Sequence, residues 1–195
     1  HRETTVLSCS VADFATITAV CNPPEVMAML NELNSRFNRL IEMRKLHLLQ
    51  AQADSWLVVG WAADRSHVSC ASSALDLALG MTAEARQIIV RHFGLPIRLR
   101  IGLALGAVTA TIFGEKLPMF VIYGESVQAA HALCAKADPG KCLVSNAVRT
   151  SVTKTLDSVY VFSSRGCVEA GARKIIAHDL ERHAQLSSAQ LAGRE

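Results

Sequence analysis

The stretch VLSCSVADFATI (residues 6–17) reads as a short buried strand that runs into a turn and then into a helix. Apolar residues dominate its first half, and the turn that follows offers Ser8, Ser10 and one acid, Asp13. Strand ends of this kind often carry catalytic carboxylates. The segment therefore borders either an active site or the remains of one.

The composition of the chain is that of a globular protein. Its 195 residues suffice for one domain with a core, and half of them are hydrophobic. The net charge of +3, from scattered Lys and Arg residues, gives no electrostatic case for a nucleic acid or a membrane surface as partner. The sequence shows no signal peptide and no apolar run near the roughly 20 residues of a membrane helix. We expect a cytoplasmic domain, which could belong to a larger membrane or soluble protein.

The cysteine pattern indicates reduced thiols in the core. None of the six cysteines forms a C-x-x-C pair, and no Cys/His cluster has zinc-finger spacing. Irregular spacing in a chain of this size favours free core thiols over disulfides.

Two long segments have helical periodicity. In EVMAMLNELNSRFNRLIEM (residues 25–43) apolar residues recur at steps of three and four, which predicts an amphipathic helix. His67–Phe93 predicts a second long helix, broken near Gly80 and stopped by Gly-Leu-Pro at 94–96.

The segment between these helices predicts a β-hairpin. The runs LHLLQAQ (46–52) and WLVVGW (56–61) are separated by three residues, with Asp54 at the tip. Trp56 and Trp61 are expected in the core and at an interface.

The second half of the chain predicts more strands and a shorter helix. IRLRIGLALG (97–106) and VTATIF (108–113) read as two strands that meet near Gly106. A helix over 125–137 is followed by Asp-Pro-Gly, which is a strong turn signal. The strand CLVS, a short helix and a β-rich end follow, with turns expected at Gly166 and Gly171.

Strands interleaved with long helices predict an α+β or α/β sandwich, with helices packed over a sheet. We expect one domain over residues 1–183 and a small, polar, frayed tail over 184–195.

With the element order fixed, five motifs together resemble the catalytic domain of class III nucleotide cyclases, the adenylyl and guanylyl cyclases. The resemblance covers about residues 4–181, almost without gaps. It implies a mostly antiparallel sheet flanked by helices, with a ferredoxin-like core, and cyclic nucleotide synthesis from GTP or ATP. The motifs are SCSVADFA (8–15), PPEVMAMLN (23–31), GLPIRLRIGLALG (94–106), YGESVQAAHAL (123–133) and RGCVEAGA (165–172).

The resemblance also implies how the active site is shared. These cyclases work as head-to-tail dimers with active sites at the interface. Two aspartates of one subunit hold two metal ions on the triphosphate, because hard cations need carboxylate oxygens. The other subunit supplies residues that read the purine, with an Asn and an Arg that stabilise the transition state.

On the metal side, the first Asp of the family corresponds to Ser10 and the second to Asp54, which is retained. A neutral hydroxyl is a far weaker ligand for Mg²⁺ than a carboxylate. Asp13 lies three residues beyond Ser10, and we expect it to cap the next helix. In transmembrane adenylyl cyclases the second catalytic half also carries Ser for the first Asp, and CSVADF is similar to that half.

On the other side of the site, the two purine-reading positions correspond to Gln50 and Val121. The Asn corresponds to Gln128 and the Arg to Ala132. Gln50 could still bond a purine edge through its amide, and Gln128 could make a weak ribose contact, but Ala132 cannot replace a cation. A late Lys or Arg of the family corresponds to Ala170, with basic residues three and four positions further on.

One nearby residue could be imagined as a substitute cation. His131 stands beside Ala132, but it is mostly neutral at pH 7, and we interpret it as a helix-surface residue.

Three hypotheses follow. The domain is a degenerate half that forms a dimer with a competent cyclase domain and regulates or supports it, a heterodimer being favoured. Alternatively, it is a non-catalytic interaction or nucleotide-sensing module, or an active cyclase that uses unusual residues. Under the first hypothesis Mg²⁺ or Mn²⁺, with ATP or GTP, binds only where a partner completes the site.

Overall fold

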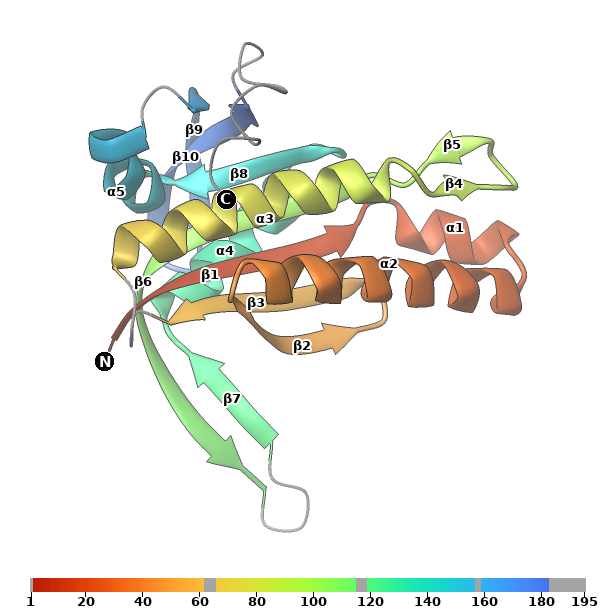
Figure 1. Cartoon of the computed structure of the whole chain (residues 1–195), viewed down its shortest axis with the longest axis horizontal. Helices are drawn as coiled ribbons and strands as arrows, with labels where there is room; N and C mark the ends of the chain where they lie inside the picture. Colours follow the sequence, from red (N-terminus) through yellow and green to blue (C-terminus); the bar gives the residue numbers. More distant parts are fainter. Residues whose placement is uncertain (1, 62–65, 115–118, 157–158, 183–195) are drawn as a thin grey trace.

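The computed structural model describes residues 2–61, 66–114, 119–156 and 159–182 (Figure 1). The expected C-terminal tail, 184–195, lies outside the described residues. The helices are Phe14–Val20 (α1), Pro23–Met43 (α2), His67–Ala85 (α3), Glu125–Lys136 (α4) and Asn146–Leu156 (α5). The strands are Arg2–Val11 (β1), His47–Gln52 (β2), Ser55–Trp61 (β3), Ile89–Val90 (β4), Leu95–Pro96 (β5), Leu99–Phe113 (β6), Met119–Tyr123 (β7), Lys141–Ser145 (β8), Tyr160–Ala170 (β9) and Arg173–Arg182 (β10).

The described strands form one large sheet in the order β2-β3-β1-β6-β8-β10-β9, and the short pair β4-β5 lies apart from it. Within the described part of the large sheet, β6 and β8 run parallel and the other paired strands run antiparallel. The far half of β6 leaves the sheet and pairs with β7, which makes the arm that extends from the body in Figure 1. The mostly antiparallel sheet with helices on both faces confirms the predicted fold class.

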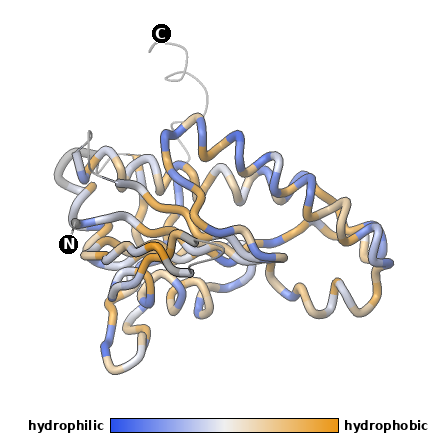
Figure 2. Tube along the Cα trace, turned by 90° about the horizontal axis from the view of Figure 1, so that it is seen from below, coloured by the Kyte–Doolittle hydropathy of each residue, from blue (hydrophilic) through white to orange (hydrophobic). Residues whose placement is uncertain are grey.

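Alternation along β1 creates the two layers of the core. Leu7, Cys9 and Val11 face a hydrophobic cluster shared with α2 and α3, whereas Val6 faces a second cluster shared with α4. Figure 1 shows α2 and α3 in front of the sheet and α4 behind it. In Figure 2 hydrophobic colour dominates the strands in the middle of the body. Because side chains alternate along a strand, Ser8 and Ser10 lie on the α4 side.

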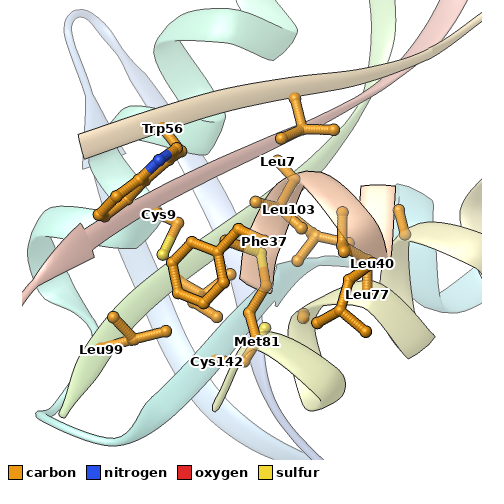
Figure 3. Close-up of a cluster of buried hydrophobic side chains, with 14 of the residues drawn as sticks. Leu7, Cys9, Phe37, Leu40, Trp56, Leu77, Met81, Leu99, Leu103 and Cys142 are labelled. Atoms are coloured by element: carbon orange, nitrogen blue, oxygen red, sulfur yellow. The ribbon is translucent and has the colours of Figure 1, made fainter. Parts of the chain in front are cut away.

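The larger cluster is centred on aromatic and aliphatic side chains from α2, α3 and the central strands (Figure 3). Trp56 is 3% exposed and packs edge-on against Phe37, with ring centres 4.9 Å apart. Its indole Nε1 donates a hydrogen bond to Asn34 Oδ1 at 3.1 Å, so its polar atom is paired in the core. Trp56 is therefore a core residue, as expected.

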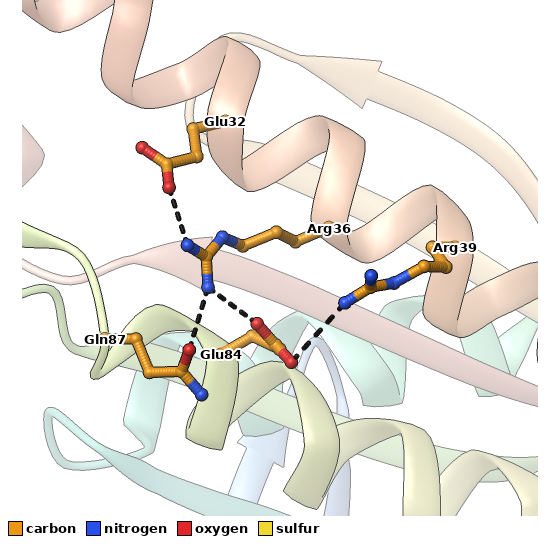
Figure 4. A network of polar contacts seen from close by, with 5 residues as sticks. All are labelled: Glu32, Arg36, Arg39, Glu84 and Gln87. Carbon is orange, nitrogen blue, oxygen red and sulfur yellow. Dashed lines mark hydrogen bonds and ion pairs between the residues drawn. The ribbon is translucent and has the colours of Figure 1, made fainter.

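Charged side chains join α2 to α3 on the outside of this layer (Figure 4). The Arg36 guanidinium donates to Glu84 at 2.7 Å, to Gln87 at 3.0 Å and, one turn earlier on its own helix, to Glu32 at 2.6 Å. Arg39 lies 3.8 Å from the second oxygen of Glu84. Hydrogen bonds to the two carboxylates raise the pKa of Arg36.

Three predictions about glycines were wrong. Helix α3 runs unbroken through Gly80 and ends at Ala85 instead of reaching Phe93, and residues 89–90 form β4. Strand β6 likewise continues through Gly106. Gly166 lies inside β9, with φ +95°, where the register with β10 shifts by one residue, so it marks a bulge and not a turn.

All six cysteines are free thiols, and Cys9, Cys70, Cys134 and Cys142 are buried, in agreement with the prediction. Within the described residues, no helix combines the length and the hydropathy needed to cross a membrane.

Candidate functional site

The end of β1 and the tip of the β2–β3 hairpin lie side by side, and this contact brings Ser10 and Asp54 together. Ser10 is the register partner of Ser55, the residue that follows Asp54. The Val11 N–H donates to the Asp54 carbonyl at 2.9 Å. Ala53 has φ +45°, which turns the chain tightly enough to place Asp54 at this end. The two positions predicted for metal ligands are therefore neighbours in space.

The Ser10 hydroxyl is turned toward α4. Its Oγ lies 3.4 Å from the Cys134 sulfur, and the Cys134 thiol donates to the Arg100 carbonyl at 3.1 Å. Burial raises the pKa of Cys134, so its thiol stays protonated at neutral pH. With that proton on Arg100, the Ser10 hydroxyl is left as the donor to sulfur. The residue at the first metal position is thus part of the contact between sheet and helix.

These residues do not fit a pair of hard cations. Asp54 is the single carboxylate at the two positions predicted for metal ligands. Among the described residues, no three His, Cys, Asp or Glu side chains come together as a metal site. Two divalent cations need several carboxylate oxygens, and a hydroxyl bound to a thiol does not replace them.

The prediction that Asp13 caps the following helix was wrong. Asp13 stands at the N-cap position of α1, but its side chain makes no capping hydrogen bond, and its backbone is left-handed with φ +57°. Its carboxylate instead faces two arginines, one just before β6 and one within it. Arg98 Nη2 donates to it at 3.1 Å, and Arg100 Nη2 lies 3.8 Å away.

Gln50 and Ser10 both line a cavity of about 430 Å³. The cavity lies between β2, the end of β1 and α4, and Gln50 is exposed on its edge strand. Its polar lining consists of hydroxyls, amides, an imidazole and a thiol: Ser8, Ser10, Gln50, Gln52, Ser55, His131 and Cys134. Among these described side chains there is no carboxylate and no Lys or Arg, so the chemistry of the cavity is polar and uncharged.

His131 lines this cavity and contacts Ser8, another residue of the lining. It is exposed on α4, as predicted, but its Nδ1 lies 3.0 Å from the Ser8 hydroxyl. Desolvation by the surrounding protein lowers the pKa of His131, which favours the neutral ring. His131 therefore supplies no cation beside Ala132.

The two positions predicted for the Asn and the Arg lie on α4. Gln128 is exposed and lines a second cavity of about 510 Å³ together with Ala170, Arg173 and Lys174. The Arg173 guanidinium pairs with Glu125 at the rim of that cavity. The structure thus brings Gln128 and the two late basic residues to one cavity.

Ala132 and Val121 contribute little to either cavity. Ala132 is half-buried and packs against the core cluster beneath α4. Val121 is half-buried on β7, paired with Thr111 of the arm. Neither belongs to the described lining of the two cavities.

Sequence reasoning missed Cys134 as part of the site, and it named Ser8 without giving it a role. The alternation of β1 was a usable signal for Ser8, because it places Ser8 on the same face as Ser10. Nothing local signals Cys134, since its contact with Ser10 spans 124 residues.

Comparisons with known proteins identify the family and the fold. The family described as Adenylate and Guanylate cyclase catalytic domain matches residues 1–182. The chain is 37% identical to soluble guanylate cyclase gcy-37 of Caenorhabditis elegans over 190 residues, which make up 97% of this chain and 27% of that protein. It is 29% identical to guanylate cyclase soluble subunit beta-2 of Rattus norvegicus over 194 residues, again 97% of this chain and 27% of that protein. The chain thus spans about a quarter of these curated relatives.

Solved structures share the fold. The guanylate cyclase domain of RhGC from Catenaria anguillulae, solved with GTP, superposes with a TM-score of 0.82 at 21% identity, over 93% of this chain and 97% of that one. The adenylyl cyclase CyaB from P. aeruginosa superposes with a TM-score of 0.84 at 15% identity, over 94% and 96% of the two chains.

Proposed function

Because the chain belongs to the adenylate and guanylate cyclase catalytic domain family, we propose that it is a cyclase domain without activity of its own. Its function is to dimerise with a competent cyclase domain and to regulate or support it. The proposal depends on the two positions predicted for metal ligands. At the first, the Ser10 hydroxyl is hydrogen-bonded to the Cys134 sulfur, and Asp54 at the second is the single carboxylate.

The second half of the site is depleted as well. Cyclisation places charge on phosphate oxygens, and preorganised cations or donors must stabilise it. Removing one such donor typically lowers the rate by about 10² or more. At Ala132 the donor is gone, and the neighbouring His131 has a lowered pKa that favours its neutral form. This loss adds to that of the first carboxylate.

The arm formed by β6 and β7 carries exposed apolar side chains, which supports the proposal that this domain binds a partner. Ile112 on β6 and Phe120 on β7 face each other in register and are 70% and 50% exposed, and Tyr123 at the end of β7 is 57% exposed. Such side chains on a projecting hairpin lose much water-exposed apolar surface when a second domain covers them. The relative named as soluble subunit beta-2 is, by its name, one subunit of an assembly.

The nucleotide substrate is proposed for the dimer of this chain with its competent partner, and not for this chain alone. The names of both curated relatives are those of guanylate cyclases, which favours GTP over ATP as the substrate of the pair. Mg²⁺ or Mn²⁺ would then be held by carboxylates of the competent partner. As a domain of such a cyclase, the chain would act in the cytoplasm.

Capture of the tagged chain from its own cells tests this proposal. The eluate is assayed with Mn²⁺ for cGMP from GTP and for cAMP from ATP, beside the purified chain alone. We expect activity in the eluate and none from the purified chain. Ile112→Asp should abolish the captured activity, whereas Met43→Asp, also at a 70% exposed site but on α2, should leave it intact.

The other outcomes identify the alternatives. A silent eluate that holds partners of another kind would favour an interaction or nucleotide-sensing module, for which the uncharged cavity beside Gln50 is the obvious ligand site. Activity from the purified chain would mean that it is a cyclase with unusual residues.

A further inference from the structure

The hairpin of β4 and β5 lies at one end of the molecule, beside α1 and the beginning of α2 (Figure 1). Its inner side is anchored in the larger core cluster by three buried side chains, Ile88, Val90 and Ile97. Its outer side and its loop are exposed: Ile89 is 50% exposed, Phe93 39% and Leu95 61%. One anchored hairpin thus presents three large apolar side chains to solvent.

The backbone of this hairpin is already ordered. The N–H groups of Phe93 and Gly94 donate to the Val90 carbonyl at 3.0 and 2.9 Å, and the Ile97 N–H donates to the Ile88 carbonyl at 2.9 Å. Gly94 has φ +64°, a left-handed conformation that suits glycine in a tight turn. Because these bonds fix the loop, its exposed side chains can bury themselves elsewhere at little further cost in backbone entropy.

The apolar surface continues from the hairpin onto the turn between α1 and α2. A cavity of about 340 Å³ lies between the two, with Ile89 on one side and Cys21 on the other. Val20, the residue before Cys21, and Met27 on α2 are exposed large apolar residues as well. Exposed apolar side chains from two distant parts of the sequence therefore gather at one end of the molecule, which is typical of an interaction surface.

This apolar end is also basic. The segment 86–97, which holds the hairpin, contains no acidic residue, and its exposed basic residues are Arg86, Arg91 and His92. Three acidic side chains line the cavities on either side of the hairpin, and each has a described partner. The partners are the Asn22 N–H for Glu25, Arg36 for Glu32 and Arg98 for Asp13. The hairpin thus keeps its positive charge beside neutralised neighbours.

We propose that this end of the chain is a contact surface for an anionic lipid membrane. Ile89, Phe93 and Leu95 enter the head-group region, and Arg91 faces the anionic lipid groups. Apolar side chains next to cations hold peripheral proteins on the anionic cytoplasmic leaflet, and no membrane-spanning helix is needed. The scattered charge of the whole chain gives no case for such a partner, but the fold concentrates positive charge beside apolar surface at this end.

The inference goes beyond the proposed function, because it concerns a surface other than the arm. The hairpin and the arm project from different sides of the body (Figure 1), so membrane contact through one leaves the other accessible to a partner domain.

Sedimentation of the 195-residue chain with lipid vesicles tests the proposal. Equimolar phosphatidylserine and phosphatidylcholine vesicles are compared with vesicles of phosphatidylcholine alone, at low and at high salt. We expect binding to the anionic vesicles that weakens at high salt, and much weaker binding to the neutral ones. No partner chain is present, so failure here leaves the proposed function untouched.

Two variants of the hairpin assign the contact. Each basic residue near an anionic surface contributes a factor of about five to binding, so Arg91→Glu, which reverses one charge, should weaken it about twentyfold. Phe93→Ser should weaken it roughly fivefold through the loss of buried apolar surface. Leu95→Ser replaces Phe93→Ser if the urea midpoint shows that the latter folds poorly.

Matched controls carry the same changes elsewhere. Lys174→Glu reverses an exposed charge on β10, and Met43→Ser removes an exposed apolar side chain at the far end of α2. Both should bind the anionic vesicles as the wild type does. The proposal is overturned if the wild type binds neither kind of vesicle, or if the folded hairpin variants bind as tightly as the wild type. A loss with Lys174→Glu equal to that with Arg91→Glu would also overturn it, because binding would then follow net charge and not the hairpin.

Discussion

Helix α4 rests directly on the backbone of β6 at Gly102, and this contact can be tested with a single methyl group. A Cβ at residue 102 would lie 2.2 Å from the Ala130 carbonyl oxygen, 2.3 Å from the Cys134 amide nitrogen and 2.9 Å from the Leu133 Cβ. Ordinary contacts lie near 3.5 Å, so the helix would have to move by about 1 Å. Gly102→Ala therefore displaces the helix that carries Cys134 and the predicted site residues.

The expected cost follows from the kind of atoms that clash. Inserting one methylene into a packed core costs about 1–3 kcal/mol when side chains can adjust. Here two of the three neighbours are backbone atoms of a helix, so we expect a loss of about 3 kcal/mol or more in the free energy of unfolding. Urea denaturation of the purified chain, followed by circular dichroism, measures this as a lower midpoint with an unchanged slope.

Gly80→Ala is the matched control. Its added methyl would lie 3.4 Å from a terminal carbon of Leu40, which can move aside. Alanine also favours the helix by roughly 1 kcal/mol over glycine, so this variant should be as stable as the wild type or more stable. A Gly102→Ala variant that unfolds at the wild-type midpoint would refute the close packing of α4 on β6.

Two further predictions concern the polar contacts. Arg36→Met keeps the aliphatic stem but removes the bonds between α2 and α3, so the urea midpoint should fall, and the difference should shrink at high salt; an equal midpoint at low salt would contradict it. For His131 the folded-state pKa lies below the unfolded value, so the unfolded chain takes up the proton first as the pH falls. The stability contributed by neutral His131 is present above about pH 6.5 and is lost as the pH drops below it. His131→Gln should therefore make the urea midpoint less sensitive to pH between about 7.5 and 5.5, and an identical pH profile would show that the ring is not desolvated.

Local pattern predicted most of the elements of this fold. Alternation in strands and periodicity in helices reflect which face of an element is buried. Because the fold buries those faces, the sequence pattern predicts the elements. Three of the errors came from glycines that were taken as breaks, whereas the end of α3 at Ala85 and the strand β7 were not predicted for other reasons. Gly80 faces Leu40 of α2 and Gly106 faces Ser126 of α4, with 3.4 Å to an added Cβ at each. Both glycines lie within continuous elements where another element packs closely. The local sequence does not distinguish such a glycine from one that ends an element, because the difference lies in the tertiary contact.

The candidate site was predictable as far as it depends on neighbouring strands. A strand end and a hairpin tip suffice to bring Ser10 next to Asp54. The contacts of Asp13 and Ser8 were not predictable, because their partners lie 85 and 123 residues away. An aspartate before a helix can either cap it or pair with a distant arginine, and the local sequence is the same in both cases.

Whether this domain lacks cyclase activity of its own is tested most directly by a cyclase assay on the purified chain alone, with Mn²⁺ and either GTP or ATP. We expect no cGMP or cAMP above the protein-free blank at any concentration of the chain. Product that increases in proportion to the chain and disappears in Asp54→Ala would contradict it, because Asp54 would then be a working metal ligand in a complete active site.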